Sequence, residues 1–395
     1  MEQIVNWRKK LLSPVAESKW ASEMVLNPAM VVNPKTNRIH MLFRATGPWD
    51  SARLPGKPLP FPIFLGYGYS DDGINFHFEL NKPVLAPSLR YNKEDIYTTN
   101  IFGERCIDYT NGCIEDPRLF FIEDTCCMTA ACRMFPPGPY WEHDEPTQCM
   151  PDWALGEENP FDTQENPTVN VLFQVNLDAL EKKDYNSAFQ YITNLTNPVY
   201  GEDRDVVLFS KKIKIEEDDC YVMIHRPQSP CKYKGNTEYK PSIMISAAKN
   251  IKDFGIGKDV KRKLLLTPTE DWQREKIGGS TPPIQLEEGC WLFNYHGKKD
   301  NIEGYAQSFM ILKEQPNDFP VIESICKDKM IVNEAEFETP SKYETPCVFF
   351  TGLIEFQDNL LVSYGAADEH VGLMQLDKKK ILEVLTGCRN VDGGK

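Results

Sequence analysis

The sequence repeats one unit five times: an apolar strand, a polar turn, and a second apolar strand that ends at a polar or ionisable residue. The first strands begin at Asn27, Asp116, Asp205, Pro282 and Val348, and the second strands end at Arg44, Arg133, Arg226, His296 and Asp368. Runs rich in Val, Phe, Tyr and Ile that flank turns of Asp, Asn and Gly are typical of β-hairpins. The sequence therefore predicts an all-β protein built on five hairpins.

The spacing of the hairpins, about 65 to 90 residues, favours a radial arrangement. In a β-propeller each blade supplies its inner strands to a shared central channel, and outer strands and long insertions would fill the rest of each interval. Two unrelated β-sandwiches with similar hairpins are the alternative. The ionisable residues at the ends of the second strands favour the propeller. In a propeller these strand ends would meet at one opening of the central channel and form a ring of ionisable side chains. We expect residues 1–395 to form a single five-bladed β-propeller domain with long insertion loops and short peripheral helices.

One segment, residues 134–170, departs from the repeated pattern. It is rich in Pro, Glu and Asp and contains Trp141 and Trp153, so we interpret it as a long insertion loop. Residues Asn176 to Tyr191 are predicted to form a short helix, and Asp377 to Leu385 a second one.

The composition excludes several kinds of partner. Asp and Glu outnumber Lys and Arg by 58 to 44, a net charge of -14, so neither a nucleic-acid partner nor an anionic membrane is expected. The 12 cysteines include no Cys-x-x-Cys spacing and are interpreted as free, mostly buried thiols. The chain has no signal-peptide pattern and no run of about 18 apolar residues. These features predict a cytoplasmic protein; its oligomeric state stays open.

Two adjacent carboxylates and a guanidinium, Glu115, Asp116 and Arg118, lie at the start of the second hairpin. Because alternate residues of a strand face opposite ways, we expect only one of the two carboxylates to point into the central channel. Taken alone, the dipeptide of Asp116 and Pro117 favours a structural turn over a catalytic role.

Short stretches along nearly the whole chain resemble glycoside hydrolase family 130, the inverting β-mannoside phosphorylases and their hydrolytic relatives. The stretches are Asn27-Pro-Ala with Phe43-Arg44, Ser70-Asp-Asp-Gly with Phe76, Glu115-Asp-Pro-Arg118, Arg204-Asp-Val-Val-Leu-Phe209 with Ile213, His225-Arg-Pro227, Trp272 with Lys276-Ile-Gly and Pro282-Pro-Ile284, Tyr295-His-Gly297, and Tyr364-Gly-Ala-Ala-Asp368. The resemblance independently implies a five-bladed propeller and a catalytic domain.

The resemblance also implies roles for individual residues. Asp116 matches the general acid of the family. The resemblance implies that the proton of this acid reaches the leaving oxygen through the sugar 3-hydroxyl. The residues that match the phosphate grip of the phosphorylases are Arg204, Arg226, Lys276 and His296, and such basic positions are typically lost in the hydrolytic branch. We assign substrate binding to Asn27, Arg44, Glu115, Arg133, Tyr305 and Asp368.

These residue types suit phosphorolysis. An inverting glycosidase needs a second carboxylate to deprotonate water, whereas phosphate already carries charge and needs only to be held beside an oxocarbenium-like centre. Arginine binds phosphate oxygens bidentately, and lysine acts as a point charge. The expected enzyme is a glycosyltransferase that acts as a β-mannoside phosphorylase on β-1,2- or β-1,4-linked oligosaccharides. It would release α-mannose 1-phosphate with inorganic phosphate as co-substrate, and no metal or organic cofactor is implied.

Three other functions stay open on the same fold. A transferase resembling family 108 would extend β-1,2-mannan from GDP-mannose, a hydrolase would use water, and a lectin would perform no chemistry. The 134–170 loop, the acidic turn at 216–219 and Ser280 depart from the commonest bacterial members of the family, so the acceptor and linkage stay open as well. Trp141 and Trp153 could form an acceptor-side wall, or the loop could be a surface insertion.

Overall fold

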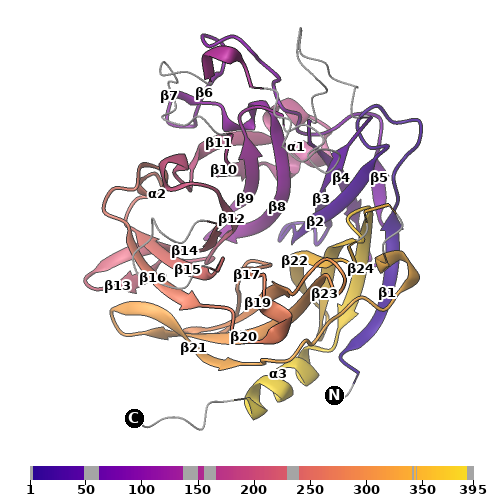
Figure 1. The fold of residues 1–395 in the computed structure, drawn as a ribbon, viewed down its shortest axis with the longest axis vertical. Coiled ribbons are helices and arrows are strands. Elements are labelled where there is room, and N and C mark those ends of the chain that lie inside the picture. Colours follow the sequence, from indigo (N-terminus) through magenta and orange to yellow (C-terminus); the bar gives the residue numbers. More distant parts are fainter. Residues whose placement is uncertain are drawn as a thin grey trace.

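Five antiparallel sheets surround a common centre in the computed structural model, which describes residues 3–48, 62–136, 150–154, 166–228, 240–339, 342–343 and 345–388 (Figure 1). Each sheet contains one of the five hairpins recognised in the sequence. The predicted all-β class and five-bladed β-propeller are therefore confirmed, and the two-sandwich alternative is wrong.

The sheets follow one another along the chain. The first holds β2 (Met24–Val32), β3 (Ile39–Thr46), β4 (Phe64–Ser70) and β5 (His77–Glu79), and the second holds β8 (Cys113–Ile122), β9 (Thr125–Arg133), β10 (Val169–Val175) and β11 (Phe189–Asn194). The third holds β12 (Asp203–Leu208), β13 (Ile213–Ile215), β14 (Asp218–Pro227), β15 (Ile243–Ala248) and β16 (Lys261–Leu266). The fourth holds β17 (Lys276–Gly279), β18 (Ile284–Glu287), β19 (Cys290–Lys298), β20 (Tyr305–Gln315) and β21 (Asp318–Ile325). A separate two-stranded ribbon consists of β6 (Tyr97–Thr99) and β7 (Arg105–Ile107).

The fifth sheet joins the two ends of the chain. Its strands β22 (Val348–Phe356), β23 (Asn359–Ala366) and β24 (His370–Leu376) come from the C-terminal part, and β1 (Val5–Leu12) from the N-terminal part. β1 pairs antiparallel with β24, with Val5 opposite Leu376. The ring of sheets is closed by hydrogen bonds between strands that are remote in sequence.

Buried apolar side chains hold neighbouring sheets together. Between the fourth and fifth sheets, Leu292 and Phe309 share one buried cluster with Phe350 and Val362, and all four side chains are fully buried. Burial of one such side chain stabilises the fold by about 1.5–3 kcal/mol. The position of each innermost strand is therefore set by packing between sheets as well as by hydrogen bonds within them.

The innermost strands of three sheets carry a β-bulge at corresponding positions. The register shifts lie between Leu26 and Ala29, between Glu115 and Arg118, and between Arg204 and Val207. Within each shift one residue has a positive φ: Asn27 at 46°, Asp116 at 51° and Asp205 at 57°. Asn and Asp tolerate this left-handed conformation better than most residues do. A bulge re-aims the side chain at that position, and here the side chain is polar in all three sheets.

The helix predictions had different outcomes. The helix expected from Asp377 to Leu385 is confirmed as α3 (Lys378–Gly387), and the Asp377 side chain caps it by accepting from the Lys380 backbone amide at 3.0 Å. The helix expected from Asn176 to Tyr191 is wrong over most of its length. Only α1 (Leu177–Glu181) is α-helical there, because β11 pairs residues 189–194 with β10 and sheet pairing overrides the apolar spacing. A further short helix, α2 (Asp253–Ile256), lies beside the third sheet.

Much of the expected insertion loop lies outside the described residues, including Trp141. In the described part, Trp153 belongs to a one-turn 3-10 helix (Asp152–Ala154), and its ring packs edge-on against Phe135 at 6.1 Å. The last residues of the segment, from Val169, already belong to β10. Within the described ranges, no helix combines the length and apolar character needed to cross a bilayer.

Candidate active site

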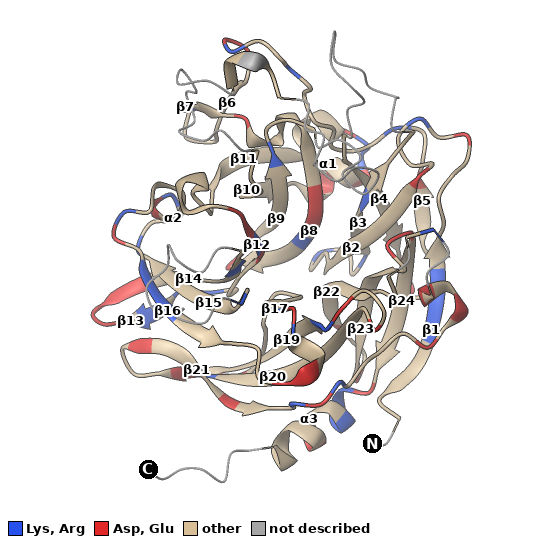
Figure 2. Cartoon of the chain, viewed as in Figure 1, with Lys and Arg blue, Asp and Glu red and all other residues tan. Residues whose placement is uncertain are grey.

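A cavity of about 660 Å³ lies where the inner strands meet, and charged, neutral polar and apolar side chains line it. It brings together eight of the eleven residues that the sequence assigned to a site: Asn27, Arg44, Glu115, Asp116, Arg133, Arg204, Tyr305 and Asp368. These residues come from the first, second, third, fourth and fifth sheets. Acidic and basic stretches therefore lie close together near the centre, as on β8 (Figure 2).

The Asp116 carboxylate is held by two neighbours from the first sheet. Its Oδ1 accepts a hydrogen bond from Asn27 Nδ2 at 2.7 Å and one from Arg44 Nη1 at 3.0 Å. Arg118 Nη1 donates to the backbone oxygen of Asp116 at 2.5 Å, which fixes the bulge from the other side. Two side chains therefore orient the carboxylate, and a third holds the backbone that carries it.

Glu115 and Asp116 both line the cavity, so the expectation that only one of them points inward is wrong. The bulge between Glu115 and Arg118 explains this, because the added residue and the positive φ of Asp116 break the alternation of the strand. Arg44 Nη1 lies 2.9 Å from Glu115 Oε2 and 3.0 Å from Asp116 Oδ1, so one guanidinium serves both carboxylates.

The carboxyl pKa values of Asp116 and Asp368 are displaced in opposite directions. Burial alone would raise the pKa of Asp116, but Arg44, Arg118 and the Asn27 hydrogen bond outweigh burial and hold it below its usual range. Burial raises the pKa of Asp368, and the nearby charge of Asp116 adds to that effect while Arg44 opposes it. Asp116 is therefore ionised in the free protein, whereas Asp368 keeps its proton to a higher pH than an ordinary aspartate.

Arg133 and Arg204 share two partners on one wall of the cavity. Arg204 Nε donates to Glu202 Oε1 at 2.7 Å and Arg204 Nη2 to Thr168 Oγ1 at 3.1 Å, while Arg133 Nε donates to the same Thr168 oxygen at 3.2 Å. Burial raises the pKa of Glu202, but the two arginines outweigh it and lower that pKa to about 2. Both guanidinium groups are thus held in fixed orientations at the cavity edge.

The other three predicted residues, Arg226, Lys276 and His296, form a second cluster outside the cavity wall. Arg226 Nε donates to Asp205 Oδ2 at 2.5 Å, and His296 Nε2 lies 3.5 Å from the same oxygen. Arg118 Nη2 lies 3.7 Å from Asp205 Oδ1. Asp205 is therefore the common partner of three cationic or ionisable groups from three different sheets.

Tyr305 connects the cavity to this second cluster. Its ring lines the cavity, lies 5.7 Å from the His296 ring, and has Lys276 Nζ 5.4 Å from its centroid. Burial, with the neighbouring charge of Arg226, lowers the pKa of Lys276 to about 8. Two aromatic side chains, Tyr305 and Phe349, thus line the cavity and also pack against His296 of the second cluster.

Sequence reasoning assigned no role in the site to three residues: Asp205, Arg118 and Tyr343. Asp205 occupies in the third hairpin the position that Asn27 and Asp116 occupy in the first two, so comparison of the repeats would have identified it. Tyr343 lines the cavity, and its buried hydroxyl has no hydrogen-bond partner in the part of the chain that the structure describes. No motif marks Tyr343, because it belongs to a connection between sheets.

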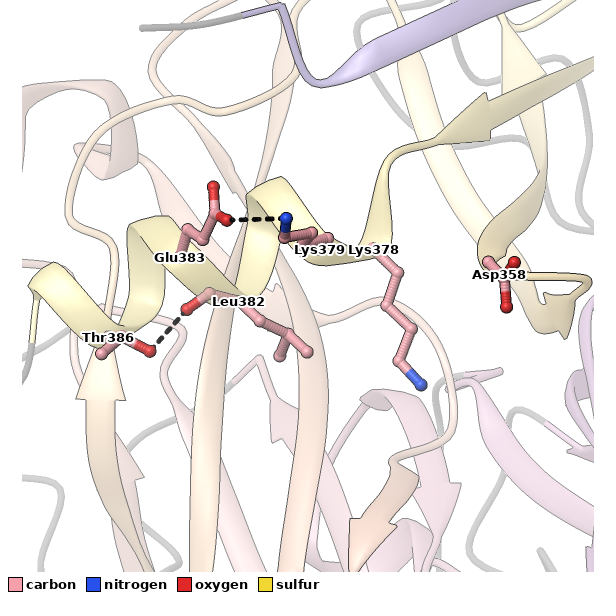
Figure 3. Close-up of a pocket in the computed structure, with 6 residues that line it drawn as sticks. All are labelled: Asp358, Lys378, Lys379, Leu382, Glu383 and Thr386. Atoms are coloured by element: carbon pink, nitrogen blue, oxygen red, sulfur yellow. Dashed lines mark hydrogen bonds and ion pairs between the residues drawn. The ribbon is translucent and has the colours of Figure 1, made fainter.

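A second hollow, beside α3, has a different character (Figure 3). It is lined by Asp358, Lys378, Lys379, Leu382, Glu383 and Thr386. Lys379 and Glu383 form an exposed ion pair at 3.8 Å, and the Thr386 hydroxyl is satisfied by Leu382 O at 2.8 Å. Since its polar groups are exposed or already paired, this hollow lacks the desolvated charges of the central cavity.

Comparison with known proteins gives the family of the chain. The family model described as β-1,4-mannooligosaccharide phosphorylase, glycoside hydrolase family 130, matches residues 162–387, which is more than half of the chain. The chain belongs to glycoside hydrolase family 130. The family resemblance found in the sequence is thereby confirmed.

Relatives of this family 130 protein extend over almost its whole length. A β-1,2-mannobiose phosphorylase of Thermoanaerobacter sp. (strain X514) is 25% identical over 380 residues, which cover 94% of this chain and 96% of that protein. The structure of the Listeria innocua β-1,2-mannobiose phosphorylase with β-1,2-mannobiose has a TM-score of 0.63 at 18% identity, covering 96% of this chain and 99% of the other. A structure reported with family 130 hydrolases that target β-1,2-mannosidic linkages in Candida mannan has a TM-score of 0.61 at 16% identity, covering 96% of each chain. At these identities the two structures show a shared fold.

Proposed function

We propose that this protein catalyses inverting phosphorolysis of β-mannosidic linkages, and the reverse synthesis, with α-mannose 1-phosphate as the phosphorylated product. In the synthetic direction it acts as a glycosyltransferase. The observation that carries the proposal is a cluster of two cationic groups, Arg226 and Lys276, with His296, next to a carboxylate-lined cavity in a chain of net charge -14. Such a cluster suits an anionic co-substrate, and family 130 membership supports a mannoside as the other substrate.

In this mechanism Asp116 is the acid and base. In synthesis, the ionised carboxylate accepts a proton from the acceptor hydroxyl; in phosphorolysis, it must first acquire the proton that the leaving oxygen takes. The hydrogen bonds from Asn27 and Arg44 orient it for either direction. Phosphate attacks the anomeric carbon from the opposite face, so no second carboxylate has to deprotonate a nucleophile.

The remaining predicted residues are assigned to binding. We propose that Asn27, Arg44, Glu115, Arg133, Tyr305 and Asp368 hold the sugar, and that Arg204, Arg226, Lys276 and His296 hold phosphate. Because the cavity draws its walls from all five sheets, residues 1–395 are proposed to act as one catalytic domain. The ten cysteines that the structure describes are free thiols, which supports a cytoplasmic location.

A donor and acceptor screen tests the function. β-1,2- and β-1,4-mannobiose are incubated with and without phosphate, and mannose 1-phosphate and GDP-mannose are compared as donors in the synthetic direction. We expect phosphate-dependent release of mannose 1-phosphate and synthesis from mannose 1-phosphate. Release of free mannose without phosphate would instead establish a hydrolase, and transfer from GDP-mannose alone would establish a transferase.

The Lys276 charge predicts an alkaline limit for phosphate binding. With a pKa of about 8, the amine is charged below that pH and neutral above it, so its attraction for phosphate is lost as pH rises through 8. We expect the KM for phosphate to rise about tenfold between about pH 7 and about pH 9.5. In Lys276→Arg the guanidinium stays charged, and the rise should disappear. An unchanged pH profile in that variant would contradict the assignment.

The Tyr343 hydroxyl predicts a contact with the sugar. Since this buried hydroxyl has no partner in the described chain, Tyr343→Phe should leave the melting temperature unchanged while kcat/KM for the mannoside falls by about 5- to 10-fold. The KM for phosphate serves as the internal control and should not move. A loss of stability without a kinetic change would assign Tyr343 to the fold alone.

A further inference from the structure

A chain of hydrogen bonds fixes the orientation of the His296 ring. His296 Nδ1 lies 3.0 Å from Ser280 Oγ, Ser280 Oγ lies 2.8 Å from Gln307 Oε1, and Gln307 Nε2 lies 2.8 Å from the Val348 backbone oxygen. His296, Ser280 and Gln307 are all fully buried. Because the chain runs from the fourth sheet to the fifth, the ring is anchored across two sheets.

The direction of each hydrogen bond follows from its last member. A backbone carbonyl only accepts, so the Gln307 amide nitrogen must face Val348 and the Gln307 carbonyl must face Ser280. Ser280 has one hydroxyl hydrogen and donates it to Gln307. Ser280 Oγ therefore accepts from His296, which places the imidazole hydrogen on Nδ1 and leaves a lone pair on Nε2.

His296 Nε2 has no hydrogen-bond partner in the part of the chain that the structure describes, although the atom is buried. The nearest charged group is Asp205 Oδ2 at 3.5 Å, which is also an acceptor. Gly278 borders the same space, where an added Cβ would lie 2.8 Å from Nε2 and 2.2 Å from Asp205 Oδ2. Two acceptors thus face one another with no hydrogen between them, and only a glycine at position 278 lets the backbone pass this close to both.

The ring stays neutral in this environment. Burial lowers the pKa of His296 to about 3; Asp205 raises it, but Arg226, Lys276 and Arg118 act with burial. At neutral pH Nε2 therefore offers a lone pair beside the Asp205 carboxylate and within the field of three cationic groups. An anion attracted by Arg226 and Lys276 would meet the Nε2 lone pair of His296. This lone pair can accept a hydrogen bond only from a ligand that carries a hydrogen.

We propose that His296 Nε2 accepts a hydrogen bond from the hydroxyl of monohydrogen phosphate, and that Ser280 and Gln307 are positioning residues that hold the ring in this tautomer. The site then selects protonated tetrahedral oxyanions against sulfate, which has the same shape and charge but no hydrogen at neutral pH. This inference rests on the proposed function, since it assigns the basic cluster to phosphate.

Equilibrium binding tests the selectivity without requiring turnover. Calorimetric titration of the full chain with phosphate, arsenate and sulfate at neutral pH is expected to give similar Kd values for phosphate and arsenate, and a Kd for sulfate about 100-fold higher. Equal Kd values for sulfate and phosphate would overturn the inference. If phosphate binds selectively but the chain performs no phosphorolysis, the proposed function fails and the selectivity stands.

Two variants test the positioning residues. In Gln307→Met the Ser280 hydroxyl loses its acceptor and is free to donate to Nδ1, so the hydrogen moves to Nε2 and the preference for phosphate over sulfate should fall at least tenfold. Ser280→Ala should lower the preference as well, because nothing then holds the Nδ1 hydrogen. The matched control is Ser308→Ala, since Ser308 is buried on the same strand as Gln307 but donates to Cys326 O at 2.8 Å.

The tautomer itself is measured by nitrogen-proton correlation spectra of the imidazole rings, with His296→Gln used to assign the signal. We expect a hydrogen on Nδ1 in the native chain and in Ser308→Ala, and a hydrogen on Nε2 in Gln307→Met. A native ring with its hydrogen on Nε2 would overturn the proposal whatever the binding constants are. If Gln307→Met lowers the melting temperature but changes neither the imidazole signal nor the preference for phosphate over sulfate, Gln307 has only a structural role. That result would also overturn the proposal.

Discussion

Asp116→Asn is expected to lower kcat for phosphorolysis of β-mannobiose by about 10²–10⁴-fold, because the variant cannot transfer a proton. The fold should persist, since asparagine tolerates the positive φ of 51° at this position and still offers an oxygen to Asn27 Nδ2. The measurement is mannose 1-phosphate release under saturating phosphate, with the melting temperature recorded alongside.

Leaving-group dependence makes the test specific. An aryl β-mannoside with an acidic phenol needs little help from an acid, so Asp116→Asn should retain far more activity on it than on mannobiose. Asp124→Asn, in the exposed turn of the same hairpin, is the matched control and should behave as the native protein. Full activity of Asp116→Asn on mannobiose would remove Asp116 from the mechanism.

Arg226→Ala should raise the KM for phosphate by about 10- to 150-fold, the range expected for loss of one charge-assisted contact. The KM for the mannoside should change little, because Arg226 lies outside the wall of the central cavity. Initial rates over a matrix of both substrate concentrations separate the two constants. Equal increases in both KM values would contradict a phosphate role.

Arg226→Ala also removes the hydrogen bond that Arg226 Nε donates to Asp205 Oδ2 at 2.5 Å. A control must therefore separate the loss of an arginine–aspartate pair from the loss of phosphate binding. Arg38→Ala removes an arginine–aspartate pair that is exposed and does not line the cavity, Arg38 Nε to Asp71 Oδ1 at 2.7 Å, and should leave both KM values unchanged. If Arg226→Ala merely unfolds the site, its melting temperature falls and Arg226→Lys, which keeps a charge, restores little phosphate affinity.

Five hairpins were predictable from the sequence because each leaves a local signature of apolar strands around a polar turn. The ring of hairpins, and a cavity that gathers Arg44, Arg133 and Asp368, could be predicted from the residues at which the second strands end. Helix α1 was overestimated because an apolar spacing within a few residues cannot distinguish a helix from the strand at 189–194, whose conformation is fixed by its partner β10.

Other parts of the site could not be read from local pattern. Glu115 and Asp116 both point into the cavity because β8 contains one added residue, the β-bulge. The alternation of side chains expected for a regular strand does not reveal such a bulge. Tyr343 lies in a connection, so its place in the cavity depends on how the fourth and fifth sheets pack. The pairing of Ser280 with Gln307 joins residues from different strands, and only their three-dimensional distance shows that they orient His296.

The pairing of β1 with β24 has a consequence for how the chain folds during synthesis. The ribosome delivers β1 first, yet its partner, which sets Leu376 opposite Val5, is among the last strands to emerge. The first four sheets can form as they leave the exit tunnel, but the fifth must wait for both ends of the chain. Until then β1 presents an unpaired edge, and a nascent chain stalled before β24 would expose it to any available strand. Premature termination late in translation should therefore be far more damaging than the few missing residues suggest.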